Sequence, residues 1–207
     1  MTIRKVDVVR RRALAPLVSA WLKRAGVRLG RDVSIIGQPI VVLGDPGSII
    51  IGEGSTLISS PRWTALGVSR PVILRTLLPG ASITIGSNVG MSGTTVCSAR
   101  SVTIGDRVLL GADVVIVDTD FHPVDELPRR HLPIPTPVAG DEVLIGPDAF
   151  IGARSIILKG STVGSGAVIG AGSVVSGVVP SRAVFAGAPA RFIRWVGAAG
   201  DTERIGQ

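Results

Sequence analysis

Aliphatic residues recur at every sixth position over the C-terminal half of the chain. Six consecutive blocks begin at Ile145 and run without a break to Pro180, reading IGPDAF, IGARSI, ILKGST, VGSGAV, IGAGSV and VSGVVP. Each block begins with Ile or Val, and its fifth residue is small in five blocks of six. A second register opens at Ile104 with IGDRVL, LGADVV and IVDTDF, and weaker copies lie around Leu29, Ile51 and Ile85.

A six-residue period fits neither an α-helix nor a long alternating strand, but it fits short strands joined by tight corners. Three blocks make one coil, so Ile145 should lie under Val163, and Ile151 under Ile169, about 4.8 Å apart in a parallel ladder. The small fifth residue then occupies a narrow interior, and glycine beside a corner tolerates positive φ. The period predicts an all-β parallel β-helix. It predicts no activity by itself, because a non-catalytic scaffold shows the same repeat.

The N-terminal segment has a different pattern, with apolar residues at helical spacing and arginines between them. This segment predicts an amphipathic helix that either packs on its own domain or contacts anionic lipid through its basic face. It is too short and interrupted to cross a bilayer, and no signal-peptide cleavage site follows it. We expect a cytoplasmic protein, and the second alternative adds peripheral contact at the inner face of the membrane through residues 1–24. The apolar positions are Val6, Val9, Ala13, Leu14, Leu17, Val18, Trp21 and Leu22.

Charge is concentrated in the same segment. The chain has 207 residues and a pI near 11.1, but residues 1–31 hold nine Lys/Arg and one acid, while the remainder carries a net charge of −1. Aromatic residues make up only 3% of the chain, so the basic stacking surface of a nucleic-acid-binding protein is missing. A single cysteine, Cys97, excludes an intrachain disulfide and a multi-cysteine zinc site.

The repeats are interrupted at residues 57–83 and 121–138, and both histidines lie in the second interruption. A long loop projecting from a solenoid is where we expect a site. His122 is the candidate general base, because imidazole has a pKa suited to proton transfer near neutral pH. Asp118 and Asp120 are both near enough in sequence to orient it, and either could instead bind an acceptor hydroxyl or cap the loop. We expect His131 to be a surface residue.

The hexads [I/V/L]-G-x-x-[A/S/V]-x over residues 29–195 resemble those of the hexapeptide-repeat acyltransferases. The segment DTDFHPVD at residues 118–125 and VFAGAPAR at 184–191 are similar to motifs of maltose, galactoside and polysaccharide O-acetyltransferases. The resemblance implies a left-handed parallel β-helix and a homotrimer with active sites between subunits. It also implies an acetyl-CoA donor attacked directly by the acceptor, with no metal and no cysteine nucleophile, which leaves Cys97 as a core residue.

Coenzyme A contacts follow from the same resemblance. Relatives present backbone to the pantetheine arm where this chain has two alanines one coil apart, and they commonly carry Trp where this chain has Phe. They also carry Thr-Lys after the last hexad valine, whereas this chain has Ser176-Gly177, so Arg182 is a candidate to replace the lost lysine. The implied cofactor-binding residues are Phe150, Ala153, Ala171, Ser176, Arg191 and Arg194.

An asparagine holds the acceptor hydroxyl in sugar O-acetyltransferases, and Ser92 and Thr94 occupy the corresponding stretch here. The SGTT sequence, with RPVIL at residues 70–74, resembles acetyltransferases of exopolysaccharide and colanic-acid-type pathways. We therefore expect transfer to a sugar hydroxyl in polysaccharide or glycan-precursor biosynthesis. A serine acetyltransferase-like activity and a non-catalytic scaffold are the alternatives. A γ-type carbonic anhydrase would need three zinc-binding histidines, and this chain has two.

The expected organisation is a basic segment at residues 1–28, the β-helical acyltransferase domain at 29–195 with its loop at 121–138, and a tail at 196–207.

Overall fold

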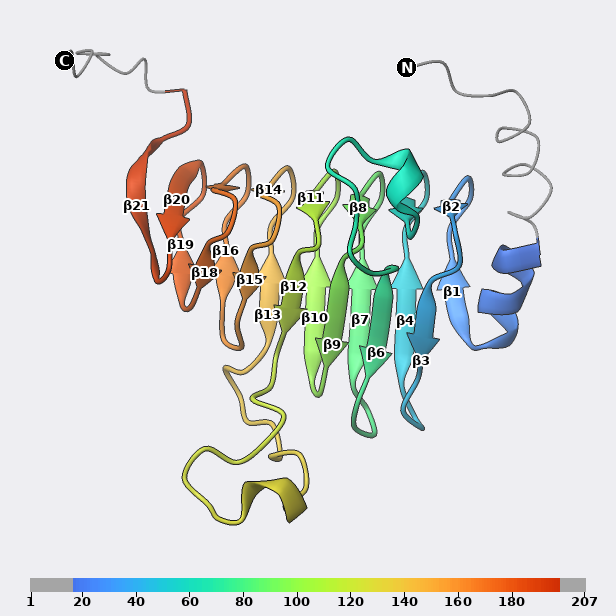
Figure 1. Cartoon of the computed structure of the whole chain (residues 1–207), viewed down its shortest axis with the longest axis horizontal. Helices are drawn as coiled ribbons and strands as arrows, with labels where there is room; N and C mark the ends of the chain where they lie inside the picture. Colours follow the sequence, from blue (N-terminus) through green and yellow to red (C-terminus); the bar gives the residue numbers. More distant parts are fainter. Residues whose placement is uncertain (1–16, 198–207) are drawn as a thin grey trace.

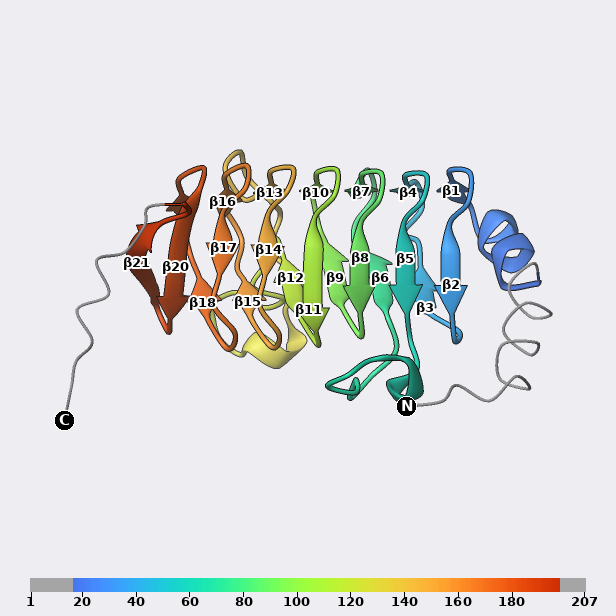
Figure 2. The same ribbon diagram turned by 90° about the horizontal axis from the view of Figure 1, so that it is seen from above.

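Three parallel sheets wind around a core of aliphatic side chains to form a left-handed parallel β-helix (Figures 1 and 2). The computed structural model describes residues 17–197. Sheet A contains β1 (Val27–Leu29), β4 (Ser48–Ile51), β7 (Ser82–Ile85), β10 (Ser101–Ile104), β13 (Val143–Ile145), β16 (Thr162–Val163) and β19 (Val178–Val179).

The other two faces of the coil are built in the same way. Sheet B contains β2 (Ser34–Ile36), β5 (Thr56–Ile58), β8 (Gly90–Ser92), β11 (Leu109–Ala112), β14 (Phe150–Ile151), β17 (Val168–Ile169), β20 (Ala183–Gly187) and β21 (Ala190–Trp195). Sheet C contains β3 (Ile40–Val42), β6 (Ile73–Thr76), β9 (Thr95–Ser98), β12 (Val115–Val117), β15 (Ile156–Ile157) and β18 (Val174–Val175). The chain visits A, B and C in turn, so each corner belongs to an A–B, B–C or C–A edge.

The register confirms the predicted stacking of successive coils. Ile145 pairs with Val163, and Ile151 pairs with Ile169, each one coil of eighteen residues apart. The first residues of the six hexads are at most 1% exposed. Burying such aliphatic side chains provides the main stabilisation of the coil.

The small fifth residues of the hexads are also interior, and those that are serines have hydrogen-bond partners there. Ser155 and Ser173 both donate from Oγ to the Gly170 carbonyl, at 2.9 and 2.7 Å, and Ser161 donates to Val175 at 3.2 Å. A buried hydroxyl is tolerated when it is bonded in this way. Serine therefore serves as well as alanine at this position.

Glycine at the second hexad position has a steric reason at the B–C edge. A Cβ on Gly152 would overlap the backbone nitrogen of Ala171 in the next coil. Coils can stack at this edge only because the residue has no side chain.

The described part of the N-terminal segment, residues 17–24, is helical and lies over the first coil beside β1 (Figure 1). Leu22 is fully buried in the core, and Val18 packs against it. The expectation that the helix packs on its own domain is confirmed for this part, and the rest of the predicted helix, residues 1–16, lies outside the described residues. Within residues 17–197, no helix has the length and apolar character needed to span a membrane.

Two excursions leave the coil. The first joins β5 to β6 at the B–C edge and includes the 3₁₀ turn η1 (Pro61–Trp63). The second joins β12 to β13 at the C–A edge, includes η2 (Arg129–His131), and extends away from the coil (Figure 1). The predicted interruption at residues 57–83 was too long, because β6 returns to the coil at Ile73 without a recognisable hexad.

Candidate functional site

His122 lies in the second excursion, shortly after β12, and is exposed to solvent. Its backbone N–H donates to the Asp120 carbonyl at 2.7 Å, and Phe121 between them has a φ of 62°, which makes the turn. Within the described residues, the imidazole has no hydrogen-bond partner. His131 is also exposed, in η2.

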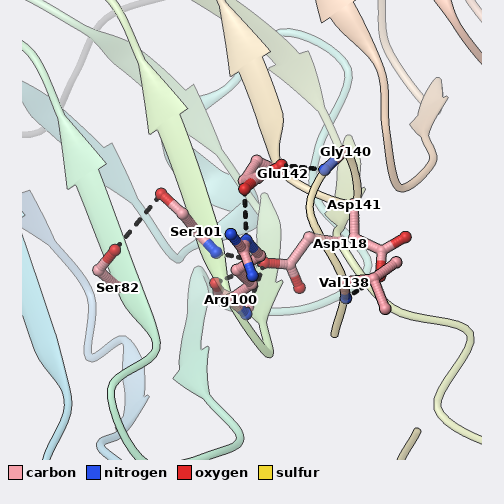
Figure 3. Close-up of polar contacts among 9 residues, drawn as sticks. Ser82, Arg100, Ser101, Asp118, Val138, Gly140, Asp141 and Glu142 are labelled. Atoms are coloured by element: carbon pink, nitrogen blue, oxygen red, sulfur yellow. Dashed lines mark hydrogen bonds and ion pairs between the residues drawn. The ribbon is translucent and has the colours of Figure 1, made fainter. Parts of the chain in front are cut away.

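Asp118 is fully buried where the excursion leaves β12. Its Oδ2 accepts hydrogen bonds from Ser98 Oγ at 2.7 Å and from the backbone N–H groups of Arg100 and Ser101 at 2.9 and 2.7 Å. Its Oδ1 accepts from the Ala99 N–H at 2.5 Å. Figure 3 shows this carboxylate beside the turn between β9 and β10. Asp118 therefore anchors the excursion to the preceding coil, and none of its hydrogen bonds involves His122.

The far end of the excursion is attached to the same turn. Glu142 forms an ion pair with Arg100 and accepts a hydrogen bond from the Gly140 N–H at 2.8 Å (Figure 3). Hydrogen bonds from its own backbone, from Arg100 and from Gly140 lower the pKa of Glu142 below its ordinary value. Sequence reasoning did not identify Arg100 or Glu142, since they are 42 residues apart and belong to no motif.

Asp120 pairs with Lys159, and the Nζ to Oδ2 distance is 2.5 Å. Lys159 also lies 3.9 Å from Asp141, and its hydrogen bond with Asp120 raises its pKa above the ordinary value. A cavity of about 530 Å³ lies between this pair and the excursion. Within the described residues, neither aspartate predicted to orient His122 forms a hydrogen bond or ion pair with its imidazole.

The two alanines predicted to face coenzyme A lie on the B–C edge, one above the other. The Gly172 N–H donates to the Ala153 carbonyl at 2.8 Å, which joins the two coils, and Ala171 is exposed. Gly152 and Gly170 precede them on the same edge, so apart from Arg154 the described corners of these two coils carry only glycine, alanine and serine. Phe150 lies in register with Leu109 and Val168 on sheet B and is 41% exposed.

The arginines of the closing motif lie on β21, the last strand of sheet B. Arg191 and Arg194 are exposed, and among the described residues their side chains donate only to backbone carbonyls, those of Ala190 and Trp195. Ser176 is exposed at the C–A edge. Arg182 lies at the A–B edge and donates to the Val196 carbonyl at 3.3 Å, so it lies on a different edge from Ser176.

The two residues predicted to hold the acceptor differ in exposure. Ser92 ends β8 and is half-buried. Thr94 is fully buried, and its Oγ1 has no hydrogen-bond partner among residues 17–197. Thr94 occupies the interior column that Ser155 and Ser173 fill in later coils, so its burial argues against contact with a substrate.

The proposed base and the proposed cofactor slot lie on different edges of the coil. His122 extends from the C–A edge, whereas Ala153 and Ala171 lie on the B–C edge, and the width of sheet C separates the two. One protomer does not bring them together. Within residues 17–197, no group of three His, Cys, Asp or Glu side chains is placed to hold a metal ion.

Comparisons with known proteins agree with this architecture. The six-repeat bacterial transferase hexapeptide family matches residues 142–177, and the hexapeptide repeat of succinyl-transferase matches residues 101–119. No curated protein matches the chain.

Solved structures with the same fold include AntD, an N-acyltransferase from Bacillus cereus in complex with dTDP and 3-hydroxybutyryl-CoA. AntD is 20% identical over 86% of this chain and 88% of its own, with a TM-score of 0.64. An AntD variant in complex with dTDP-4-amino-4,6-dideoxyglucose and coenzyme A has a TM-score of 0.65, at 20% identity over 86% of this chain and 89% of its own. A hexapeptide transferase family protein from Anaplasma phagocytophilum is 17% identical over 84% of this chain and 86% of its own, with a TM-score of 0.51. At these identities the likeness concerns the fold.

Proposed function

Because the chain is a hexapeptide-repeat protein of the bacterial transferase type, we propose that it is an acetyl-CoA-dependent O-acetyltransferase. Its acceptor is a sugar hydroxyl, in a polysaccharide or glycan precursor. The complexes of AntD with acyl-CoA and with a dTDP-sugar support an acyl-CoA donor and a sugar acceptor.

In the proposed reaction, the acceptor hydroxyl attacks the thioester carbon while His122 Nε2 or Nδ1 takes its proton. The tetrahedral intermediate collapses, the carbon–sulfur bond breaks, and the imidazolium returns the proton to the leaving thiolate. The products are the acetyl ester and coenzyme A. No covalent enzyme intermediate is needed, so Cys97, which is buried and whose pKa burial raises, takes no part.

The observation that carries this proposal is that His122 and the two alanines, Ala153 and Ala171, lie on different edges of the coil. In a cyclic trimer, the C–A edge of one protomer can face the B–C edge of the next, since every subunit meets its neighbour through the same pair of surfaces. Each of three equivalent sites then takes its base from one subunit and its cofactor slot from another. Either Asp118 or Asp120 was expected to orient the base. In the proposed trimer, the group that orients His122 comes from the neighbouring subunit, or it is Asp120 after Asp120 leaves its ion pair with Lys159.

The donor is proposed to lie along the B–C edge. The pantetheine arm passes Ala153 and Ala171, where backbone is accessible, and Phe150 provides a flat apolar surface beside it. Arg191 and Arg194, which have no acidic partner within the described residues, bind the phosphates. Ser176 contacts the cofactor from the C–A edge of the adjacent subunit.

Calorimetric titration with acetyl-CoA, followed by thiol release with a panel of sugars, amino sugars and nucleotide-sugars, tests the proposal. We expect saturable binding and release that depends on a hydroxyl-bearing sugar. Release only with amino sugars would replace O-transfer by N-transfer, the reaction of AntD. Absence of acetyl-CoA binding would refute the transferase and leave the scaffold alternative.

Peripheral membrane contact through the N-terminal segment is a separate proposal. Because Leu22 belongs to the core, the deletion that tests it should remove residues 1–16 and leave the helix over the first coil intact. We expect this deletion to reduce co-sedimentation with vesicles containing anionic lipid. Unchanged co-sedimentation would contradict it.

A further inference from the structure

A second pocket lies on the B–C edge, immediately beside the proposed cofactor slot. It has a volume of about 380 Å³, and it is formed where the first excursion crosses the corners that follow β11 and β14. Its lining consists of Ser69, Arg70, Asp113, Val115, Arg154 and Ile156.

A buried carboxylate fixes the first excursion in place over this pocket. Asp113 is 6% exposed, and both of its oxygens accept a hydrogen bond from the Ser69 N–H, at 2.9 and 3.1 Å. The Asp113 backbone is itself held by a hydrogen bond to the Ser92 carbonyl at 2.9 Å. Arg70, the next residue in the excursion, is thereby positioned at the pocket.

Arg154 reaches the pocket from the following coil. It occupies the corner after Gly152 and Ala153, and its backbone N–H donates to the Ala112 carbonyl at 2.7 Å. Its φ of 60° makes a sharp corner. Stacking of the coils fixes the backbone at this corner and so fixes where the Arg154 side chain begins. Two guanidinium groups from distant parts of the sequence therefore line one pocket.

Neither guanidinium has a carboxylate partner in the described part of the chain. Within residues 17–197, no side-chain hydrogen bond or ion pair involves Arg70 or Arg154, whereas Arg31, Arg100 and Arg107 are each paired with a carboxylate. The only acid in the lining is Asp113, and Ser69 occupies both of its oxygens. The pocket thus carries an excess positive charge above a floor formed by Val115 and Ile156.

We propose that this pocket binds the phosphate groups of the acceptor, and that the acceptor is a sugar linked to a diphosphate. Arginine binds phosphate through charged, geometrically matched hydrogen bonds, and the apolar floor suits the group that the diphosphate carries. The assignment to the acceptor rests on the proposed function. With the donor phosphates at Arg191 and Arg194 and the thioester near Ala153, the pocket lies beyond the reacting end of the donor.

Inorganic pyrophosphate is the first probe, titrated by calorimetry into protein that is saturated with coenzyme A. We expect binding that weakens about tenfold in Arg70→Gln and about a hundredfold in the Arg70→Gln, Arg154→Gln double variant, since each change removes a charge-assisted contact. The matched control is Arg28→Gln with Arg62→Gln, which removes the same charge from residues outside the pocket. A double Arg→Lys variant keeps the charge but loses the paired N–H geometry, so its affinity should lie between those of the wild type and the double Gln variant.

Uridine diphosphate and geranyl diphosphate then distinguish a nucleotide-linked from a lipid-linked acceptor. Tighter, arginine-dependent binding of either one over pyrophosphate identifies the carrier and supports the proposal. Pyrophosphate binding that the double variant does not change, or that coenzyme A displaces, would overturn it. If the protein binds pyrophosphate through these arginines but binds no coenzyme A, the pocket is an anion site. That result would refute both its role as an acceptor site and the proposed function.

Discussion

Replacing Asp118 with alanine should destabilise the protein far more than replacing Asp120, although the two residues are neighbours in one motif. Asp118 is fully buried and accepts four hydrogen bonds, one from a hydroxyl and three from backbone N–H groups. Asp120 is 36% exposed and has one ion pair, with Lys159.

The magnitude follows from the donors that Asp118→Ala leaves behind. Each buried donor without an acceptor costs about 1–3 kcal/mol. Ser98 and Ala99 are buried, so the full cost applies to the Ser98 hydroxyl and the Ala99 N–H. Arg100 and Ser101 are half-buried, so their N–H groups can donate to water instead. We expect a loss of about 3–5 kcal/mol, against about 0–1 kcal/mol for the exposed ion pair in Asp120→Ala.

Urea unfolding of the three proteins at one chain concentration measures the difference, because the stability of the proposed trimer depends on its concentration. With a slope of about 2 kcal/mol per molar urea, Asp118→Ala should lower the midpoint by roughly 1.5–2.5 M. A loss below about 1 kcal/mol for Asp118→Ala, or equal losses for both variants, would refute the anchoring role derived from its hydrogen bonds.

Three further predictions concern the base, the corner and an acid-dependent ion pair. His122→Ala should lower kcat about 10²- to 10⁴-fold with unchanged sedimentation, and an active, folded variant would contradict the assignment of His122. Gly152→Ala should prevent folding, because the added Cβ would overlap the backbone of the next coil. Gly80→Ala, whose Cβ meets nothing within 4 Å, should cost about 1 kcal/mol of stability. Thermal melts followed by circular dichroism compare the two variants, and equal melts would contradict the steric argument. Arg107 donates hydrogen bonds to both oxygens of Asp148 and lowers the pKa of this carboxyl below its ordinary value of 3.8. The ion pair therefore stabilises the fold above pH 3.8, and this stabilisation is lost as the pH falls through the lowered pKa of Asp148. The stability difference between wild type and Arg107→Gln should therefore vanish in acid; a difference that persists there would contradict it.

The coil could be predicted from the sequence because the six-residue repeat determines its geometry. A residue such as Ile151 stacks on Ile169 for no reason other than the eighteen-residue length of one coil, and the aliphatic and small positions follow from it. The strand at Ile73–Thr76 was missed because it follows an excursion whose length no period sets, and because an exposed arginine, Arg75, interrupts its apolar pattern.

The candidate site was predictable only in part. His122 was chosen because histidine is rare in this chain and lies in the interruption of the repeats; the structure places it in the projecting excursion, and its role as the base stays a prediction. The role of Asp118 could not be read from its place in the same motif, since its partners at residues 98–101 lie in the preceding coil, 17 to 20 residues away. Thr94 was chosen for its hydroxyl, but its register in the hexad places that hydroxyl in the interior. The Arg70 and Arg154 pocket depends on how the first excursion folds back, which no local pattern specifies.

The central claim, that each active site takes its base from one subunit and its cofactor slot from the next, is tested most directly by mixed oligomers. Two inactive variants are co-expressed with different tags: His122→Ala, which lacks the base, and Ala171→Trp, which fills the slot at an exposed position. Trimers that carry both tags contain one intact site in three, so we predict about a third of the wild-type rate. Mixed oligomers as inactive as both parents would contradict the shared site.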